Sequence, residues 1–288
     1  MILLAKGVRL NLQSQMRVFS SGVALALSMA SLLSAQGIRP PRLPVHSFQW
    51  INSCPYNVDQ KAVVLWFFEE GCPRCRAKWP ELIRLSEKYA EQPVVFIAIS
   101  SGTNRREMES YIRDVGVTWP TLLDSNREFE KNAGVQQINL QNIHQVSVID
   151  GRGRYSRGDW GNVESCVTTA LTGAAWQYFE AEQVPVEAQA AWRHVEFGQY
   201  TQAASLLTQL QLSQDVRVVT AAEKLWEITR GALERDIATL PSSADVWIRY
   251  QAMRAIADKY QGIELPEDFR REGSRLHTLP EIGTRLQK

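Results

Sequence analysis

The segment that most constrains the fold of this chain is Ala62–Phe68, a run of seven apolar residues that are mostly β-branched or aromatic. The run is too short for a typical helix and has no polar residue on either face, which is typical of a strand buried on both sides. Four residues further on, Cys72-Pro73-Arg74-Cys75 opens a segment whose apolar residues recur at helical spacing. We therefore predict a buried strand, a short turn and a helix that begins at a pair of cysteines.

Downstream of this helix, strand-like and helix-like segments alternate along the chain. Such alternation favours a mostly parallel sheet. The turn Gly151-Arg152-Gly153 separates the last two strand segments, which favours a hairpin that adds antiparallel strands. The predicted fold is therefore α/β, a mixed sheet flanked by helices. The predicted segments are strands at 94–99, 119–123, 146–150 and 154–160, and helices at 104–115, 125–134 and 162–171.

The second half of the chain has a different character. From Ala174 to Lys288 we find no convincing strand pattern, and helical segments dominate. Trp192 with Gly198–Ala204 resembles part of one tetratricopeptide repeat, but a solenoid needs about three or more copies and no second copy is evident. We therefore predict an α/β domain at 45–172 and an all-α domain, a helical bundle, at 174–288. Its predicted helices lie at 188–197, 202–210, 216–237 and 244–260.

The N-terminal segment has the composition of a targeting sequence. Lys6, Arg9 and Arg17 precede a mostly apolar run at 18–33, and small residues follow it, which is typical of a secretory signal peptide at 1–37. An uncleaved membrane anchor is the alternative, although the run is shorter than the ~20 residues of a spanning helix. Either reading predicts an exported protein, periplasmic or extracellular, and a membrane contact only if this segment stays attached. The formal net charge of +1 gives no basic surplus for nucleic-acid binding.

The cysteine pair occupies a position that favours reactive sulfur. Pro73 suits the first position of a helix, and the free N–H groups of the first turn then face the sulfur of Cys72. Both these groups and the positive end of the helix dipole favour the thiolate, which is the nucleophile. Arg74 and Arg76 add positive charge nearby. We expect an exposed Cys72 that attacks a disulfide of another protein, and a deeper Cys75 that resolves the mixed disulfide.

Two simpler interpretations of the pair are less favourable. As half of a zinc site it needs a second pair of ligands, and none occurs at the usual spacing. As a structural disulfide it closes a very short loop, which gains little chain entropy. The sequence therefore predicts dithiol–disulfide exchange with protein thiols and disulfides, without a metal and without a dissociable cofactor.

The region from about Phe48 to Leu171 resembles the thioredoxin superfamily, especially exported redoxins related to bacterial cytochrome-maturation and thiol–disulfide reductase proteins. The resemblance rests on the strand that leads to the cysteine motif and on Pro80 inside the first helix, where proline normally costs ~3 kcal/mol. It also rests on Trp119–Asp124 and on Val148–Gly151 before the hairpin. It implies a thioredoxin-like fold and a thiol–disulfide oxidoreductase, here with an added helical domain.

This sequence departs from the family pattern at three places. His144, preceded by Ile143, stands where the family usually has a cis-proline, so we expect a trans bond and an altered substrate groove, since a non-proline cis bond costs ~2.5–4 kcal/mol. The family's buried acid falls on Trp66, which leaves Glu69 and Glu70 as the nearest carboxylates, expected as solvated turn residues. The Pro-Arg dipeptide within the motif is expected to make the pair more oxidising.

Several residues outside the motif remain open to more than one interpretation. His144 is a surface loop residue, a partner of the Cys72 thiolate, or a third ligand with Cys72 and Cys75 for a soft metal or an iron–sulfur cluster. Cys54 and Cys166 are either a structural disulfide or two buried free thiols. The other histidines are expected to be ordinary loop or surface residues: His46, His194 and His277.

The main rival function is a binding module, in which the thioredoxin-like fold is redox-silent and the helical domain holds a protein partner. The missing cis-proline favours this rival, and the intact cysteine motif favours the enzyme. A peroxidase of the peroxiredoxin type is disfavoured, because the pattern P-x-x-x-[ST]-x-x-C does not occur around these cysteines.

Overall fold

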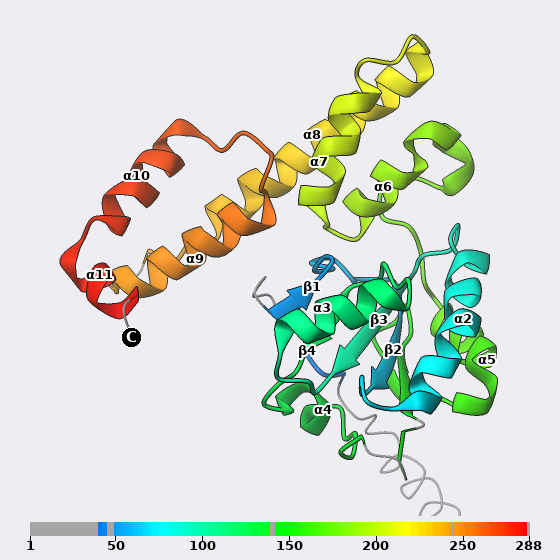
Figure 1. The fold of residues 1–288 in the computed structure, drawn as a ribbon. Coiled ribbons are helices and arrows are strands. Elements are labelled where there is room, and N and C mark those ends of the chain that lie inside the picture. The colour runs from blue at the N-terminus through cyan, green and yellow to red at the C-terminus, as the bar shows by residue number, and fades with distance from the viewer. Residues whose placement is uncertain (1–39, 45–48, 139–141, 144, 243–244, 287–288) are drawn as a thin grey trace, which may run out of the picture. The chain divides into compact units, whose positions relative to one another are not determined.

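The computed structural model describes residues 40–44, 49–138, 142–143, 145–242 and 245–286 (Figure 1). The predicted signal segment at 1–37 lies outside this part. The chain from residue 40 onward clusters as one compact unit. Within the described ranges, no helix combines the length and the apolar character needed to cross a membrane.

A six-stranded mixed sheet forms the centre of the first half of the chain. Its middle strand pair is parallel, with Phe68 beside Ser100, and on the other side Phe67 pairs with Gln145 in antiparallel register. This arrangement confirms the predicted α/β fold with a hairpin at one side. In spatial order the strands are β1 (Trp50–Ile51), β4 (Thr121–Leu123), β3 (Val94–Ser100), β2 (Ala62–Phe68), β5 (Gln145–Ile149) and β6 (Tyr155–Arg157).

Helices flank this sheet in the predicted order. The side chain of Asn104 accepts hydrogen bonds from the N–H groups of Arg106 and Glu107, so the helix predicted from the capping pattern begins directly after it. The first and last helices lie side by side and are joined by an ion pair between Lys88 and Glu164 (Figure 1). The helices are α2 (Pro73–Lys88), α3 (Arg105–Asp114), α4 (Glu128–Asn132) and α5 (Val163–Ala170).

The core of this part is built on β2, whose seven residues are all buried. Trp66 and Trp79 are almost fully inaccessible and pack edge to face, with ring centroids 6.1 Å apart. Pro80 lies inside α2 as the resemblance implied, and it faces solvent. Burial of large aromatic rings contributes much of the stability of such a core, because each removes a large apolar area from water.

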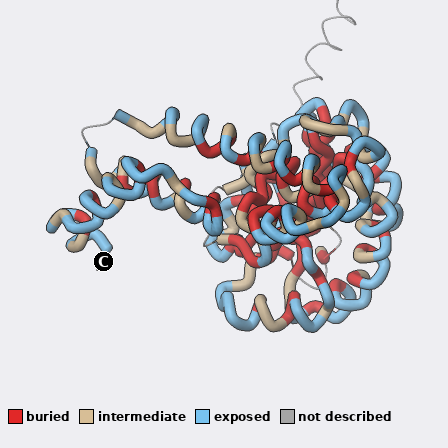
Figure 2. Tube along the Cα trace, turned by 90° about the horizontal axis from the view of Figure 1, so that it is seen from above, coloured by how far each residue is buried: buried red, intermediate tan, exposed pale blue. Residues whose placement is uncertain are grey.

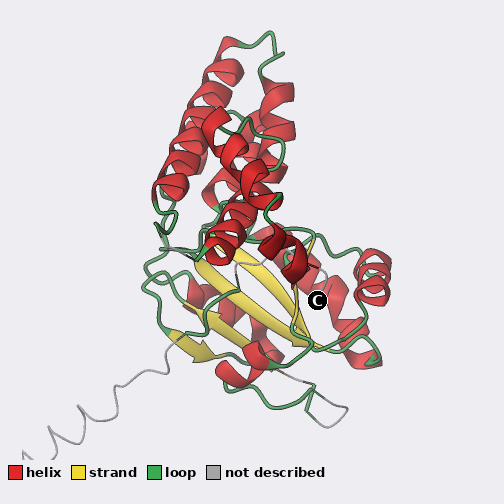
Figure 3. Cartoon of the chain, turned by 90° about the vertical axis from the view of Figure 1, so that its left-hand side faces the viewer, coloured by secondary structure: helices red, strands yellow, loops and turns green. Residues whose placement is uncertain are grey.

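The rest of the described chain is helical (Figure 3). A second hydrophobic cluster, separate from that of the sheet, begins at Val184 and holds these helices together. Figure 2 shows that buried residues are dense around the sheet and sparser along the helices near the C-terminus. Two short helices precede this set, η3 (Ala181–Gln183) and η4 (Val186–Ala188). The α-helices are α6 (Gln189–Glu196), α7 (Tyr200–Leu210), α8 (Val216–Ala238), α9 (Val246–Lys259), α10 (Glu267–His277) and α11 (Pro280–Leu286).

A buried ion pair connects the sheet to the helices. The Nζ atom of Lys61, immediately before β2, lies 3.0 Å from Oε2 of Glu196 at the end of α6, and both side chains are 0% exposed. Lys61 also donates to the carbonyl of Ala175. Glu196 accepts hydrogen bonds from the N–H groups of Gln177 and Tyr178. The segment between the two hydrophobic clusters is thus fixed to both of them, and we call this set of contacts the junction clasp.

Gly198, between α6 and α7, allows the backbone near Asn57 to pack closely against the end of α6. It has φ of +69°, a conformation that favours glycine, and a Cβ there would lie 2.9 Å from the backbone nitrogen of Asn57. The N–H of Asn57 donates to the carbonyl of Phe197, and its side chain donates to the carbonyl of Glu196. The predicted domain boundary near residue 173 is therefore crossed by several hydrogen bonds, and the division at this point stays a prediction.

Candidate active site at the Cys72–Cys75 dithiol

Cys72 occupies the residue directly before the first turn of α2. The turn Glu69–Gly71 links β2 to this position, and the N–H of Cys72 donates to the carbonyl of Glu69. The sulfur of Cys72 accepts a hydrogen bond from the N–H of Cys75 at 3.3 Å, and Pro73 follows in the first turn of the helix. An N–H group of the helix start therefore points at this sulfur, as the sequence predicted.

Both cysteines are buried free thiols, with exposed fractions of 1% for Cys72 and 0% for Cys75. The prediction that Cys72 is exposed is wrong in this conformation, because the turn after β2 sets its side chain into the hydrophobic cluster of the sheet. Burial raises the pKa of Cys75 to about 12, and the nearby Cys72 and Glu69 carboxylate act in the same direction. A hydrogen bond from the backbone of Glu69 opposes this increase in the pKa.

Positive charge and aromatic rings surround the first turn of α2. Arg74 and Arg76 are exposed, and the guanidinium of Arg76 lies 4.8 Å from the ring centroid of Tyr111. The hydroxyl of Tyr111 accepts a hydrogen bond from Nε1 of Trp79 at 2.9 Å. A cation held over an aromatic face in this way keeps its charge near the dithiol.

Trp66, at the position where the family has a buried acid, makes the floor beneath α2 apolar. Its ring stacks on Trp160 with centroids 4.3 Å apart, and its Nε1 atom is buried without a hydrogen-bond partner among the described residues. The nearest carboxylates are those of Glu69 and Glu70, which are half-buried rather than solvated as predicted. The reason is that the turn folds against the end of β3, where Ser100 donates a hydrogen bond to Glu70.

His144, the candidate third partner of the cysteines, lies outside the described residues. Its neighbour Ile143 is fully buried and accepts a hydrogen bond from the N–H of Gln145. Among the residues that the structure describes, no group of three or more His, Cys, Asp or Glu side chains is placed to hold a metal ion.

The structure does not bring Cys54 and Cys166 together. Cys54 follows β1 at one edge of the sheet, near the carbonyl of Pro44, and burial raises the pKa of its thiol to about 12. Cys166 lies on α5, where its sulfur accepts a hydrogen bond from the N–H of Asp159, just after β6 at the opposite edge. Both are free and buried, the second of the two predicted alternatives.

Of the three histidines predicted to be ordinary loop or surface residues, His46 lies outside the described residues. The other two gain partners in the fold, and for His194 the prediction is wrong, because it is a partly buried helical residue. His194 is partly buried on α6, and its Nδ1 atom lies 2.7 Å from Oε1 of Gln199. His277 is exposed on α10, but its Nδ1 atom lies 2.9 Å from the hydroxyl of Tyr250. Gln199 lies beyond the end of α6, and Tyr250 lies on a different helix from His277, so helical spacing gave no sign of these contacts.

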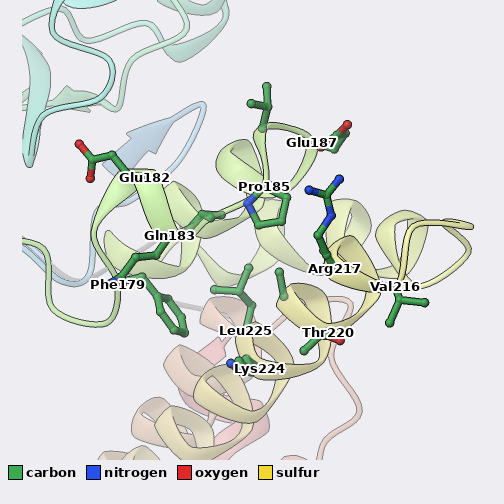
Figure 4. Close-up of a pocket in the computed structure, with 13 residues that line it drawn as sticks. Phe179, Glu182, Gln183, Pro185, Glu187, Val216, Arg217, Thr220, Lys224 and Leu225 are labelled. Atoms are coloured by element: carbon green, nitrogen blue, oxygen red, sulfur yellow. The ribbon is translucent and has the colours of Figure 1, made fainter.

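A cavity of about 860 Å³ lies in the helical part, away from the cysteines (Figure 4). Phe179 and Leu225 form its apolar wall, and Arg217 and Glu187 face each other across its mouth. Its lining contains no cysteine and no histidine. The dithiol and this cavity are therefore separate features of the molecule.

A mixed sheet in this strand order, with a dithiol at the start of the helix that follows its central strand, defines a thioredoxin-like fold. Comparison with known proteins agrees with this class, since residues 42–154 match the model of the AhpC/TSA family. No match was found among curated proteins.

Several solved structures are similar to this part of the chain. DsbF of Mycobacterium tuberculosis is 20% identical, with a TM-score of 0.35 over 40% of this chain and 84% of that chain. A secreted disulfide oxidoreductase of the same organism, described as homologous to Escherichia coli DsbE, is 18% identical, with a TM-score of 0.34 over 39% and 84%. A thiol:disulfide interchange protein of the thioredoxin family from Chlorobium tepidum is 22% identical, with a TM-score of 0.34 over 40% and 82%.

Proposed function

We propose that this protein is a thiol–disulfide oxidoreductase that exchanges disulfides with exported proteins through Cys72 and Cys75. The observation that carries the proposal is the hydrogen bond from the N–H of Cys75 to the sulfur of Cys72 at the start of α2. The N–H groups at the start of a helix favour negative charge, and the thiolate is the form of a cysteine that attacks a disulfide. The AhpC/TSA match supports a redox role of the thioredoxin type.

The reaction proceeds through a mixed disulfide. The Cys72 thiolate attacks one sulfur of a partner's disulfide, the partner's S–S bond breaks, and its other sulfur leaves as a thiolate that takes up a proton. Cys75 then loses its proton and attacks the Cys72 sulfur, which releases the second partner sulfur and leaves a Cys72–Cys75 disulfide. Two electrons pass from the dithiol to the partner, and the reverse sequence oxidises a partner dithiol.

The raised pKa of Cys75 suits its role as the resolving residue. Because burial raises the pKa of this thiol, it is less ionised than an ordinary cysteine and competes less for the first attack. We expect native protein at pH 8 to be alkylated by iodoacetamide at Cys72 well before Cys75. Mass spectrometry of the wild type beside a Cys72→Ser variant measures this order, and faster alkylation of Cys75 contradicts the assigned roles.

One observation favours the rival function, a redox-silent binding module whose helical part holds a protein partner. Cys72 is 1% exposed, and a buried sulfur cannot meet a partner's disulfide unless the residues over it move. The oxidoreductase function therefore requires a motion that opens the start of α2.

Trapping separates the two functions. A Cys75→Ala variant, incubated with an oxidised protein extract from outside the cytoplasm, should accumulate mixed disulfides that reducing agent releases. The Cys72→Ser variant is the matched control and should accumulate none. Absence of trapped species, together with no alkylation of Cys72 in the native protein, supports the binding module instead.

Export is the second part of this proposal. The segment at 1–37 has the charged, apolar and small-residue regions of a signal peptide. Expression of the full chain, fractionation and N-terminal sequencing of the product test it. A mature N-terminus near residue 37 supports cleavage, and full-length protein in the cytoplasm contradicts export.

A further inference from the structure

A cleft between α9 and α10 combines an apolar floor with a cationic rim. Its volume is about 440 Å³, within the usual range of small-molecule sites. Met253, Leu265 and Phe269 line the apolar part, and Met253 and Phe269 are buried. We call this feature the α9–α10 cleft.

The charged groups of the α9–α10 cleft all have the same sign. Arg254 and Arg270 line it together with His277, and its lining contains no aspartate or glutamate. The nearby carboxylate of Glu272 is engaged elsewhere, by two hydrogen bonds from Arg249. Among the described residues, the ion pairs of the helical part involve neither Arg254 nor Arg270.

Three hydrogen-bonding groups meet at one corner of the cleft. The hydroxyl of Tyr250 lies 2.9 Å from Nδ1 of His277, and Nη1 of Arg254 donates to the same hydroxyl at 3.4 Å. The ring of Tyr250 also stacks on that of His277, with centroids 5.9 Å apart. Tyr250 therefore holds the imidazole and one guanidinium beside each other at the rim.

Gly273 keeps the cleft open on the side of α10. Glycine is poorly favoured inside a helix, and no backbone feature requires it here, since its φ is not in the left-handed region. A Cβ at this position would lie 3.7 Å from Cε of Met253, which is ordinary contact. A larger side chain would extend into the cleft, so the absence of one preserves space for a ligand.

We propose that the α9–α10 cleft binds a medium-chain fatty acid. The carboxylate pairs with Arg254 and Arg270. Hydrogen bonds between a guanidinium and a carboxylate are charge-assisted and therefore stronger than those between neutral groups. The acyl chain lies over Met253, Leu265 and Phe269, where it leaves water for apolar surface. This site does not depend on the dithiol, so the proposal stands apart from the redox function.

Calorimetric titration of the full chain with decanoate, below its micelle concentration, tests the proposal. We expect one-to-one binding, and decanol and acetate should each bind at least about tenfold more weakly, because each lacks one half of the recognised chemistry. The double variant Arg254→Gln/Arg270→Gln should lose about tenfold or more in decanoate affinity while keeping its helical circular dichroism.

Space in the cleft is tested separately. Gly273→Leu should abolish decanoate binding, and Gly273→Ala, the matched control, should remain folded and reduce it less. Three results would each overturn the fatty-acid assignment. They are equal affinity for decanol and decanoate, unchanged decanoate binding by the double arginine variant, and tighter binding of a peptide that ends in leucine than of decanoate. Absence of any decanoate binding at millimolar concentration overturns it as well.

Discussion

The two ends of β2 differ in how completely their buried polar groups are paired. At its start, the junction clasp pairs a buried ammonium with a buried carboxylate, and the remaining hydrogen-bonding capacity is used by backbone groups. After its end, Cys72 and Cys75 lie in an apolar setting with one N–H directed at a sulfur. At the first end the buried polar groups have partners, and this arrangement stabilises the fold. The second holds two free thiols with few polar contacts, which is consistent with the proposed exchange chemistry.

The largest effect is expected at the junction clasp. Glu196→Ala leaves the ammonium of Lys61 buried without its counter-ion, and such a change costs about 3–5 kcal/mol in the free energy of unfolding. Urea denaturation followed by circular dichroism measures it. Glu81→Ala is the matched control, because the side chain of Glu81 is 53% exposed and its pair with Lys78 lies at the surface, where such pairs contribute only about 0.2–1 kcal/mol. Equal losses in the two variants would remove the contrast between the ends of β2.

A double variant sharpens the same comparison. In Lys61→Met with Glu196→Gln the buried charges are gone. The N–H groups of Gln177 and Tyr178 donate to different oxygens of Glu196, so the amide oxygen keeps one of these two hydrogen bonds. We expect it to recover about 1–3 kcal/mol relative to Glu196→Ala. If the double variant is no more stable than Glu196→Ala, the loss comes from the missing carboxylate itself and not from the unpaired charge of Lys61.

At the other end of β2 smaller effects are expected. Cys72 caps α2 through its sulfur, so Cys72→Ala should lower the free energy of unfolding by about 1 kcal/mol. Cys72→Ser should preserve it, because serine is a favoured capping residue, although the variant has no redox activity. Thermal and urea unfolding of the two variants side by side checks this. A serine variant less stable than the alanine variant contradicts the capping role.

The smallest effect concerns acid stability near the junction. Burial lowers the pKa of His194, a nearby Arg193 acts in the same direction, and the hydrogen bond with Gln199 opposes them. As the pH falls below the usual histidine value of about 6.5, the unfolded chain takes up a proton that the folded chain resists. Stability from this group is therefore complete above that pH and decreases below it. His194→Gln should flatten the decrease between about pH 6.5 and 5, as unfolding at a series of pH values can measure.

The elements around the dithiol were predictable because their signals are local. The apolar run of β2 matches its predicted bounds. Asn104 indicates the start of α3, because its side chain caps that helix. The strand β1 was missed, since it has two residues whose partners, such as Leu122, lie far along the chain. Helices α10 and α11 were also missed, because α10 is strongly polar overall and buries only Phe269 and Leu276.

The site itself was predictable only in part. The position of Cys72 before a helix follows from the sequence, but its burial depends on how the turn packs against the core. The junction clasp was not predicted, because Lys61 and Glu196 are separated by more than a hundred residues and neither belongs to a recognisable pattern. Charged pairs of this kind are identified by the fold and not by spacing.

The position of Lys61 also sets a length scale for the whole protein. The seven residues of β2 extend over roughly 20 Å, at about 3.3 Å per residue, between the clasp and the turn that leads to Cys72. At this separation a substitution at Lys61 or Glu196 touches neither cysteine, so its effect on stability can be measured apart from any effect on the dithiol.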